Sequence, residues 1–350
     1  MTDSLDPTAG SPRTAPRPTM TAVLVRETGG RGAWNRLELG QVAQPEPGSD
    51  QVLVQVAACS VNRADLLQRR GLYPPPPGES TILGLDFAGY VVQKGAAVST
   101  WHVGDRVFGI VAGGGYGRYP AVACEHLLAI PENLSFIEAA AVAEVFLTAY
   151  VNLMVEAGLR SGETLLVHGG SGGVGSAAIQ LARAFGARVV TTAGSADRRA
   201  AAVELGAAAA FDYHADDWPD QVRAATAGQG VDLVLDWIGA PYLSRHLELL
   251  KQCGRLVLIG LQGGREAAID LAPLLGKRLR LIGSVLRSRD RREKARLIAA
   301  FRDRVLPLLS RRTVKPIVDR IFPMAEVEAA HNYLKQGGQF GKVVLTWSPQ

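Results

Sequence analysis

The segment at residues 168–175 reads HGGSGGVG and places five glycines within seven positions, directly after an apolar run. Gly170, Gly172 and Gly175 have the G-x-G-x-x-G spacing of turns that bind a dinucleotide. In such turns the first glycine permits the tight bend, the second lets backbone N–H groups approach a pyrophosphate, and the third lets helix and strand pack closely. A glycine-rich turn without a ligand is the alternative, but it accounts poorly for so many glycines. The segment therefore predicts a dinucleotide site.

The flanking sequence supplies the elements that such a turn needs. Residues 164–168 are a short apolar run typical of a buried strand, and residues 174–185 have a helical pattern that Gly186 closes. A second apolar run, ARVVTTA at residues 187–193, follows at once. The start of the helix presents free N–H groups and the positive end of its dipole to an anion. This strand–turn–helix–strand order is the context in which the motif binds a nucleotide.

The residues after the second strand carry positive rather than negative charge. An acid at this position would accept hydrogen bonds from the ribose 2′-hydroxyl of NAD and would repel a 2′-phosphate. Here the strand ends at Ser195 without an acid, and Asp197 stands where the first turn of a helix favours it. Ser195 offers a hydroxyl and Arg198 or Arg199 a guanidinium, which suit a phosphate. The sequence therefore favours NADPH over NADH, although two solvated arginines on a helix face would give the same pattern.

The character of the chain changes near residue 135. From Met20 to about Pro131, short β-like runs alternate with glycine and proline, which indicates a compact, mostly antiparallel β domain. From Glu163 to Ser284, strand and helix patterns alternate, and short continuous apolar strands of this kind indicate a parallel sheet covered on both faces. A helical pattern from Ser135 to Gly158 opens on the S-x-x-E spacing of a capping box. The predicted fold class is α/β with a second, mostly β domain.

The last part of the chain does not continue this α/β repeat. A charged helical pattern runs from Arg291 to about Val305. It is followed by a strand-like PIVDRIF, a helical AEVEAAHNYLKQ and a closing strand KVVLTW. These elements therefore need a place outside the parallel sheet.

The composition narrows the function classes. With 350 residues, 47% hydrophobic and 20% charged, the chain has the character of an ordinary globular protein of two domains. The net charge of +5 is scattered, and no long basic stretch interleaved with aromatics indicates a nucleic-acid face. Three cysteines without C-x-x-C spacing indicate neither a disulfide framework nor a zinc knuckle, so we expect a reducing, cytoplasmic compartment. No apolar run reaches the roughly 18 residues of a membrane span, and residues 1–19 have the composition of a disordered tail.

Motifs along most of the chain resemble one protein family. They include VNRADLLQRRGLYPPPP, ILGLDFAGYVVQKG, LTAY, HGGSGGVGSAAIQLA, DLVLDWIG, SVLRSR and GKVVLTW, in this order. Together they resemble a zinc-free medium-chain dehydrogenase/reductase of the quinone oxidoreductase (zeta-crystallin-like) branch. The resemblance implies a GroES-like, mostly β catalytic domain of residues 20–146 and 288–350. It also implies an inserted Rossmann domain of residues 147–287 with a doubly wound parallel sheet, NADPH in the cleft, and a homodimer.

The resemblance bears directly on zinc. Zinc-dependent relatives place a cysteine where this chain has Asn62, and a histidine–glutamate pair where it has Leu85 and Asp86. Asn62 and Leu85 cannot hold zinc in the usual Cys/His manner, so we expect no metal and interpret Asp86 as structural. Without a Lewis acid to polarise an alcohol or carbonyl oxygen, alcohol oxidation is disfavoured. An acceptor that needs little polarisation, such as a quinone or an activated alkene, is favoured.

The resemblance also assigns residues to the cofactor and the substrate. The nicotinamide end is expected near Asn62, Tyr73 and Thr148, in a pocket walled by Ile259, Gly260, Leu261 and Leu286. The pyrophosphate is expected to bind to Ser171, Gly172, Gly173, Val174 and Gly175, with a further contact from Lys342. The 2′-phosphate and adenine are expected beside Ser195, Arg198 and Tyr213. Structural alternatives stay open. Asn62 is a good N-cap for a helix at residues 63–70, Tyr73 can pack against the stiff run Pro74–Pro77, and Thr148 can be an ordinary helix residue. We interpret His168 as a packed turn residue rather than a base.

Two classes of function follow. The first is an enzyme that reduces a small quinone-like acceptor with NADPH, by direct hydride or stepwise electron transfer, with Tyr73 and Asn62 orienting the acceptor rather than transferring an essential proton. Within this class, a 2-alkenal or enoyl reductase is the alternative. The second class is a non-catalytic NADPH-binding protein. The retained pocket residues favour the enzyme, and we expect neither nucleic acid nor a membrane as a partner.

Overall fold

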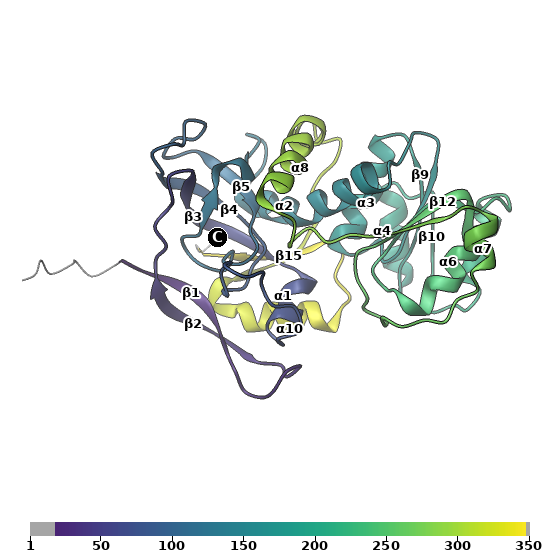
Figure 1. Cartoon of the computed structure of the whole chain (residues 1–350), viewed down its shortest axis with the longest axis horizontal. Helices are drawn as coiled ribbons and strands as arrows, with labels where there is room; N and C mark the ends of the chain where they lie inside the picture. The colour runs from purple at the N-terminus through teal and green to yellow at the C-terminus, as the bar shows by residue number, and fades with distance from the viewer. Residues whose placement is uncertain (1–17, 348–350) are drawn as a thin grey trace, which may run out of the picture.

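The computed structural model describes residues 18–347 and consists of two bodies joined by a central helix (Figure 1). The predicted tail of residues 1–19 lies almost entirely outside the described residues. Strand β1 begins at Thr19, one residue before Met20.

The body at the right of Figure 1 is built on a parallel sheet of six strands in the order β10-β9-β8-β11-β12-β13. The strands are β8 Thr164–Val167, β9 Arg188–Thr192, β10 Ala209–Phe211, β11 Val231–Asp236, β12 Leu250–Leu258 and β13 Arg280–Gly283. Its helices are α3 Gly173–Ala184, α4 Ala196–Glu204, α5 Trp218–Ala225, α6 Leu243–Leu249 and α7 Ala272–Gly276. The strand order reverses between β8 and β11, as in a doubly wound Rossmann sheet, and nucleotides bind at such a reversal. The predicted α/β fold class is confirmed.

The body at the left of Figure 1 contains a sheet of seven strands, which forms along the path β14-β15-β3-β4-β5-β7, with β6 paired to β3. The strands are β3 Gln51–Val61, β4 Asp86–Lys94, β5 Arg106–Ile110, β6 Ala121–Ala123, β7 Leu127–Ala129, β14 Val318–Pro323 and β15 Lys342–Thr346, and the hairpin β1 Thr19–Arg26 with β2 Arg36–Ala43 stands beside them. The short helix α1 Arg63–Gln68 and the helix α10 Val327–Gln336 belong to the same body. All pairs in this sheet are antiparallel except β14 with β15.

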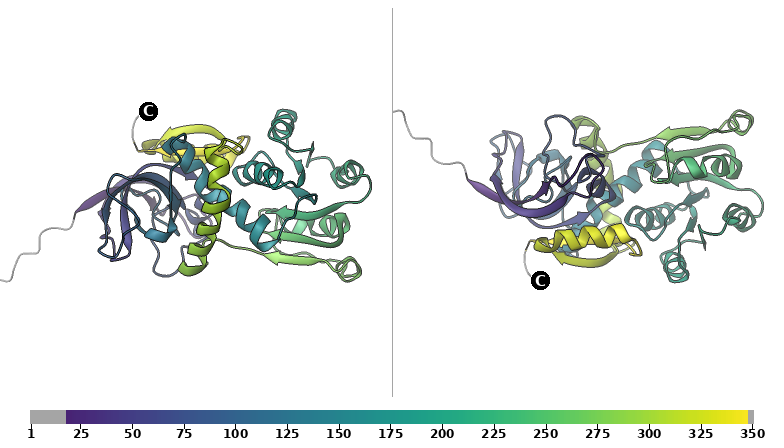
Figure 2. Two further views of the ribbon diagram at one scale, coloured as in Figure 1. Left: turned by 90° about the horizontal axis from the view of Figure 1, so that it is seen from above. Right: turned by 90° about the horizontal axis from the view of Figure 1, so that it is seen from below.

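The chain returns to its first body at the end. Strand β15 pairs antiparallel with β3, so Val343 lies opposite Val61 although 282 positions of sequence number separate them. Figure 2 shows the yellow C-terminal segment on the same half as the purple and blue N-terminal strands. This return explains why the last strands did not fit the α/β repeat. The domain bounds expected at residues 147 and 287 remain predictions, because helix α2 crosses the first of them.

Helix α2, Phe136–Tyr150, lies between the two bodies (Figure 2). Its predicted capping box is confirmed: the Ser135 hydroxyl accepts from the Glu138 N–H, and the Glu138 carboxylate accepts from the Ser135 N–H. The helix continues as a π-helix over Val151–Glu156, and Gly158 then takes a positive φ of 61°. Helix α8, Arg291–Arg304, and the short α9, Leu306–Ser310, pack nearby.

The expectation that no segment has the length and hydropathy of a membrane span needs a correction. The continuous helix Phe136–Glu156 is long and apolar enough by composition, but 78% of its apolar window is buried inside the protein. One hydrophobic cluster around it includes Ala58 of the seven-stranded sheet and Val167 of the six-stranded sheet. The helix is therefore largely apolar because both bodies pack against it.

Candidate functional site

The glycine-rich turn connects β8 to α3 at the reversal of strand order. A Cβ on Gly170 would lie 2.2 Å from the Thr191 hydroxyl oxygen, and one on Gly175 would lie 2.3 Å from the Gly169 carbonyl oxygen. These two glycines are required by contact between turn, helix and strand. At Gly172 the nearest atom to an added Cβ is the Gly169 oxygen at 3.4 Å, so this glycine borders open space. The turn can therefore receive a pyrophosphate at the start of α3.

A lysine from the other body reaches this turn. Gly341 forms a parallel bridge with Gly172 and donates its N–H to the Ser171 carbonyl at 2.8 Å. The following residue, Lys342, is buried, and a Cβ on Gly173 would lie 2.6 Å from its Cδ. The structure thus brings Ser171, Gly172, Gly173 and Lys342 together, as the sequence analysis expected.

The Lys342 ammonium continues into a buried polar network of the seven-stranded sheet. Its Nζ donates to the Asn62 Oδ1 at 2.6 Å and to the Val61 carbonyl at 3.0 Å. The Asn62 amide donates in turn to the Asp86 carboxylate at 2.8 Å, and Ser60 donates to that carboxylate through both its N–H and its hydroxyl. Burial raises the pKa of Asp86, while Lys342 and these hydrogen bonds oppose the rise. Asn62 therefore connects an ammonium to a carboxylate.

The capping interpretation of Asn62 is correct only in part. Asn62 does precede α1, and the Asp65 carboxylate accepts from its backbone N–H at 2.8 Å. Its side chain, however, bonds to Lys342 and Asp86 in the network described above. Burial raises the pKa of Asp65 to about 7, and this carboxyl also accepts from the hydroxyl of Tyr116.

Helix α2 contributes a third carboxyl group to this region, that of Glu144. The Thr148 hydroxyl donates to the Glu144 Oε1 at 2.9 Å. The other oxygen, Oε2, has no hydrogen-bond partner among residues 18–347, and Glu144 as a whole is half-buried. Burial raises the pKa of Glu144, Lys342 lowers it, and Asp86 raises it further.

Tyr73 is held by an arginine that arrives from the end of β13. The buried Arg287 donates to the carbonyls of Tyr73 at 3.0 Å and Ala112 at 2.7 Å, and to the Gln68 side chain at 2.6 Å. Its guanidinium lies 4.9 Å from the centre of the Tyr73 ring, within the range of a cation–π contact. Burial raises the pKa of Tyr73, although Arg287 opposes this shift, so the phenol is neutral near pH 7.

The residues expected to bind the 2′-phosphate lie between β9 and the first turn of α4. Ser195 is the N-cap of α4, and its hydroxyl oxygen accepts from the Arg198 Nε at 2.9 Å. Arg199 forms an ion pair with Asp212 at 2.8 Å, whereas Arg198 has no ion pair within the described part of the chain. A Cβ on Gly194 would lie 2.4 Å from the Tyr213 hydroxyl, so Tyr213 stands at the same strand end.

The expected nicotinamide wall follows the ends of β12 and β13. Ile259, Gly260 and Leu286 are half-buried, while Leu261 is exposed. Trp237, which follows β11, fills the space beside them: it would meet a Cβ on Gly260 at 3.0 Å and one on Gly169 at 3.0 Å.

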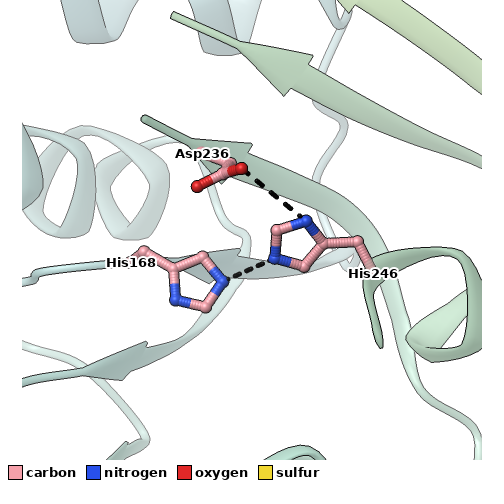
Figure 3. Close-up of side chains that lie close together, drawn as sticks. All are labelled: His168, Asp236 and His246. Atoms are coloured by element: carbon pink, nitrogen blue, oxygen red, sulfur yellow. Dashed lines mark hydrogen bonds and ion pairs between the residues drawn. The ribbon is translucent and has the colours of Figure 1, made fainter. Parts of the chain in front are cut away.

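His168 belongs to a buried cluster with His246 and Asp236 (Figure 3). The two histidines are 2.7 Å apart at their Nε2 atoms, and the His168 Nδ1 lies 3.1 Å from the Thr192 hydroxyl oxygen. Two ligands of a tetrahedral zinc would be about 3.3 Å apart, so this pair has the spacing of a hydrogen bond between rings. Burial lowers the pKa of His168 to about 3. The interpretation of His168 as a packed residue is confirmed.

Several residues of the site were absent from the sequence analysis, among them Ser60 and Asp65 of the polar network, Glu144, Arg287 and Trp237. Glu144 lies one turn before Thr148 on α2, a spacing that places both on one face of a helix and could have pointed to it. Arg287 and Trp237 carry no local signal, because each acts on a segment distant in sequence.

Comparison with known proteins places these features in a wider group. Residues 48–133 match the family described as alcohol dehydrogenase GroES-like domain, and residues 173–301 match the family described as zinc-binding dehydrogenase. The human protein named quinone oxidoreductase is 33% identical to this chain over 329 residues, which cover 93% of this chain and 97% of that protein.

Solved structures agree on the fold. The Escherichia coli quinone oxidoreductase complexed with NADPH has a TM-score of 0.81 and 27% identity, and the match covers 93% of this chain and 99% of that one. A structure described as an NAD-dependent alcohol dehydrogenase has a TM-score of 0.82 and 32% identity, covering 94% and 100%. These similarities, together with the glycine turn, support a nicotinamide cofactor and an oxidoreductase.

Proposed function

Because the chain belongs to the quinone oxidoreductase family of the medium-chain dehydrogenases/reductases, we propose that it reduces a small quinone-like acceptor with NADPH and without zinc. The proposal depends above all on Lys342, whose side chain packs against Gly173 of the glycine turn and whose ammonium donates to the Asn62 side chain. This contact links residues expected to bind the pyrophosphate to Asn62, which is expected to orient the acceptor. Arg287 fixes the position of Tyr73 by donating to its carbonyl oxygen.

The residues fit a nicotinamide dinucleotide. Gly172 borders open space at the start of α3, where backbone N–H groups and the helix dipole favour a pyrophosphate. The hydroxyl of Ser195 and the guanidinium of Arg198, which has no ion pair within residues 18–347, favour a 2′-phosphate and hence NADPH. When bound, the nicotinamide supplies a hydride. Ile259, Gly260, Leu261 and Leu286 are proposed to wall its pocket, and Val174, Gly175, Thr148 and Tyr213 to complete the contacts along the cofactor.

The acceptor side favours a planar carbonyl compound. Tyr73 offers a flat ring and a neutral hydroxyl, and Asn62 offers a neutral amide, so both can orient a carbonyl group. Asn62 and Leu85, the latter buried and apolar, provide no Cys or His ligand for zinc. Positioning over the nicotinamide can itself lower a barrier by several kcal/mol when the acceptor takes a hydride unaided.

The proposal is tested by steady-state oxidation of NADPH and of NADH with a panel of quinones, enones, 2-alkenals and simple carbonyl compounds. We expect turnover with quinones and a preference for NADPH. Turnover of enals or enones alone would assign the reductase alternative, and turnover of alcohols with NAD⁺ alone would assign alcohol oxidation. NADPH binding without any turnover would assign a non-catalytic binding protein.

We also propose a homodimer in which strand β13 pairs with its copy. β13 is the edge of the six-stranded sheet, and its outer side carries unpaired backbone groups. Apolar side chains near it are exposed, among them Leu281 (38%), Val285 (50%) and Leu275 (81%). Light scattering should give twice the chain mass for the wild type and a monomer for Leu281→Lys. A monomeric wild type at micromolar concentration would refute this assembly.

The expected cytoplasmic location also remains a proposal. The cysteines of the chain, Cys59, Cys124 and Cys253, are all free, which agrees with a reducing compartment.

A further inference from the structure

The reaction proposed above needs a proton as well as a hydride. Reduction of a quinone-like acceptor consumes one hydride and one proton, because the electron pair displaced through the conjugated system arrives on a carbonyl oxygen. Tyr73 and Asn62 were assigned only to orientation. A source for the proton therefore remains to be found in the cleft, and general acids contribute about 10²–10⁴-fold to such steps.

Three carboxyl groups near Lys342 could hold this proton, and their hydrogen bonds distinguish them. Asp65 is fully buried and accepts from the N–H groups of Asn62 and Gly84 and from the Tyr116 hydroxyl. Asp86 accepts from the Ser60 N–H, the Ser60 hydroxyl and the Asn62 amide, and Asn62 links it to the Lys342 ammonium. These donors stabilise the anionic form of Asp86. Glu144 accepts from a single hydroxyl, that of Thr148. Of the three groups, Glu144 is the one with the fewest hydrogen-bond donors to stabilise a negative charge.

The surroundings of Glu144 agree with a protonated side chain. The charged or titratable groups that face it are Asp86 on β4, Lys342 on β15 and Tyr73 in the loop after α1. Lys342 is the one cation among them, and it already compensates Asp86 through Asn62. Burial and the negative charge of Asp86 both raise the pKa of Glu144. Glu144 is half-buried rather than fully buried, so the group can be reprotonated from solvent after each turnover.

We propose that Glu144 is the proton donor of this oxidoreductase and that its carboxylic acid protonates the acceptor oxygen on which the electron pair arrives. This inference rests on the proposed function. The acceptor gains a hydride at one end of its conjugated system and a proton at the other. The O–H bond of Glu144 breaks and an O–H bond forms on the acceptor. The resulting carboxylate takes a proton from solvent, so one NADPH and one proton are consumed for each acceptor reduced by two electrons.

Kinetics against pH test the assignment in full-length protein with a quinone that the wild type reduces. The wild-type kcat should fall as the pH rises through the pKa of Glu144, because the acid form is the active one. Glu144→Gln should lower kcat by about 10²-fold or more and lose this pH dependence. Glu144→Asp should retain it at reduced rate. Glu132→Gln removes an exposed carboxyl just before α2 and serves as the matched control.

A second variant separates a catalytic from a structural role. The Thr148 hydroxyl stabilises the carboxylate of Glu144, so Thr148→Val should raise the pKa of Glu144 and move the falling limb of the profile to higher pH. A purely structural role of Glu144 would leave the limb in place. The affinity for NADPH, measured by titration, should change little in Glu144→Gln.

Infrared spectroscopy provides a readout that needs no turnover. The wild type should show a protonated carboxyl band that titrates with the same pKa as kcat and is missing in Glu144→Gln but present in Glu132→Gln. If the wild type reduces quinones but Glu144→Gln keeps its rate and pH profile, or the band persists, the donor assignment is wrong and the proposed function stands. If the wild type reduces no quinone-like acceptor, the proposed function and the donor role fall together.

Discussion

Replacement of Arg198 by alanine should remove most of the preference for NADPH. Arg198 lies in the first turn of α4, its Nε is fixed by the Ser195 hydroxyl at 2.9 Å, and it has no ion pair within residues 18–347. A hydrogen bond to a charged group contributes about 1.5–3 kcal/mol. Since about 1.4 kcal/mol corresponds to a factor of ten, Arg198→Ala should weaken NADPH binding about ten- to a hundredfold. The half-buried position of Arg198 favours the lower part of this range.

Arg199 offers a matched control on the same turn. Its guanidinium is already paired with Asp212 at 2.8 Å, so it is less free to contact a phosphate. Because its guanidinium is already engaged in this half-buried pair, Arg199→Ala should change NADPH affinity only about two- to threefold.

Fluorescence titrations of both variants and the wild type with NADPH and NADH measure these effects. NADH affinity should be nearly unchanged in Arg198→Ala, because NADH lacks the 2′-phosphate. The wild-type preference should also shrink as salt is added, since exposed charge contacts are screened. Equal wild-type affinity for the two cofactors, or an Arg198→Ala protein that keeps its preference, would refute the reasoning.

Three further predictions follow from other parts of the site and core. Elemental analysis should find no stoichiometric zinc, and chelators should leave the activity intact, since Asn62 and Leu85 offer no Cys or His ligand. Stoichiometric zinc together with chelator-sensitive activity would contradict this prediction. Tyr73→Phe and Asn62→Ala should each lower kcat/KM about ten- to a hundredfold, or about 1.4–2.8 kcal/mol, whereas abolished activity of Tyr73→Phe with normal NADPH affinity would show a different role. Burial lowers the pKa of His331 to about 3, below its value of about 6.5 in the unfolded chain. Below pH 6.5 the unfolded chain therefore binds a proton that the folded protein does not. The free energy of unfolding is unaffected by this group above pH 6.5 and decreases as the pH falls toward 3. In urea unfolding between pH 6 and 4, His331→Gln should therefore reduce the pH slope of the free energy of unfolding by about 1.4 kcal/mol per pH unit, and an unchanged slope would exclude this histidine as the cause.

The dinucleotide turn and the parallel sheet could be predicted from the sequence because their signals are local. Gly170 and Gly175 are demanded by contacts with Thr191 and Gly169, which lie within one strand–turn–helix–strand unit. Such contacts depend on the spacing of residues a few positions apart, and glycine is the one residue type that satisfies them. The N-cap at Ser135 and the stop at Gly158 are local in the same sense. The resemblance to a family added the expected site residues, but not how they bond.

The connections between those residues were decided by the tertiary structure. Lys342 bonds to Asn62 across 280 positions of sequence, and Arg287 to Tyr73 across 214. These pairs meet because β15 returns to β3 and because the segment after β13 crosses from the six-stranded sheet to the loop of Tyr73. A hydrogen bond leaves no periodic trace in the chain when its partners lie on separate elements. The environment of Glu144 depends on Asp86, Lys342 and Tyr73, which come from three separate segments of the chain. The sequence could not reveal this environment, because only the folded chain brings these groups near one carboxyl group.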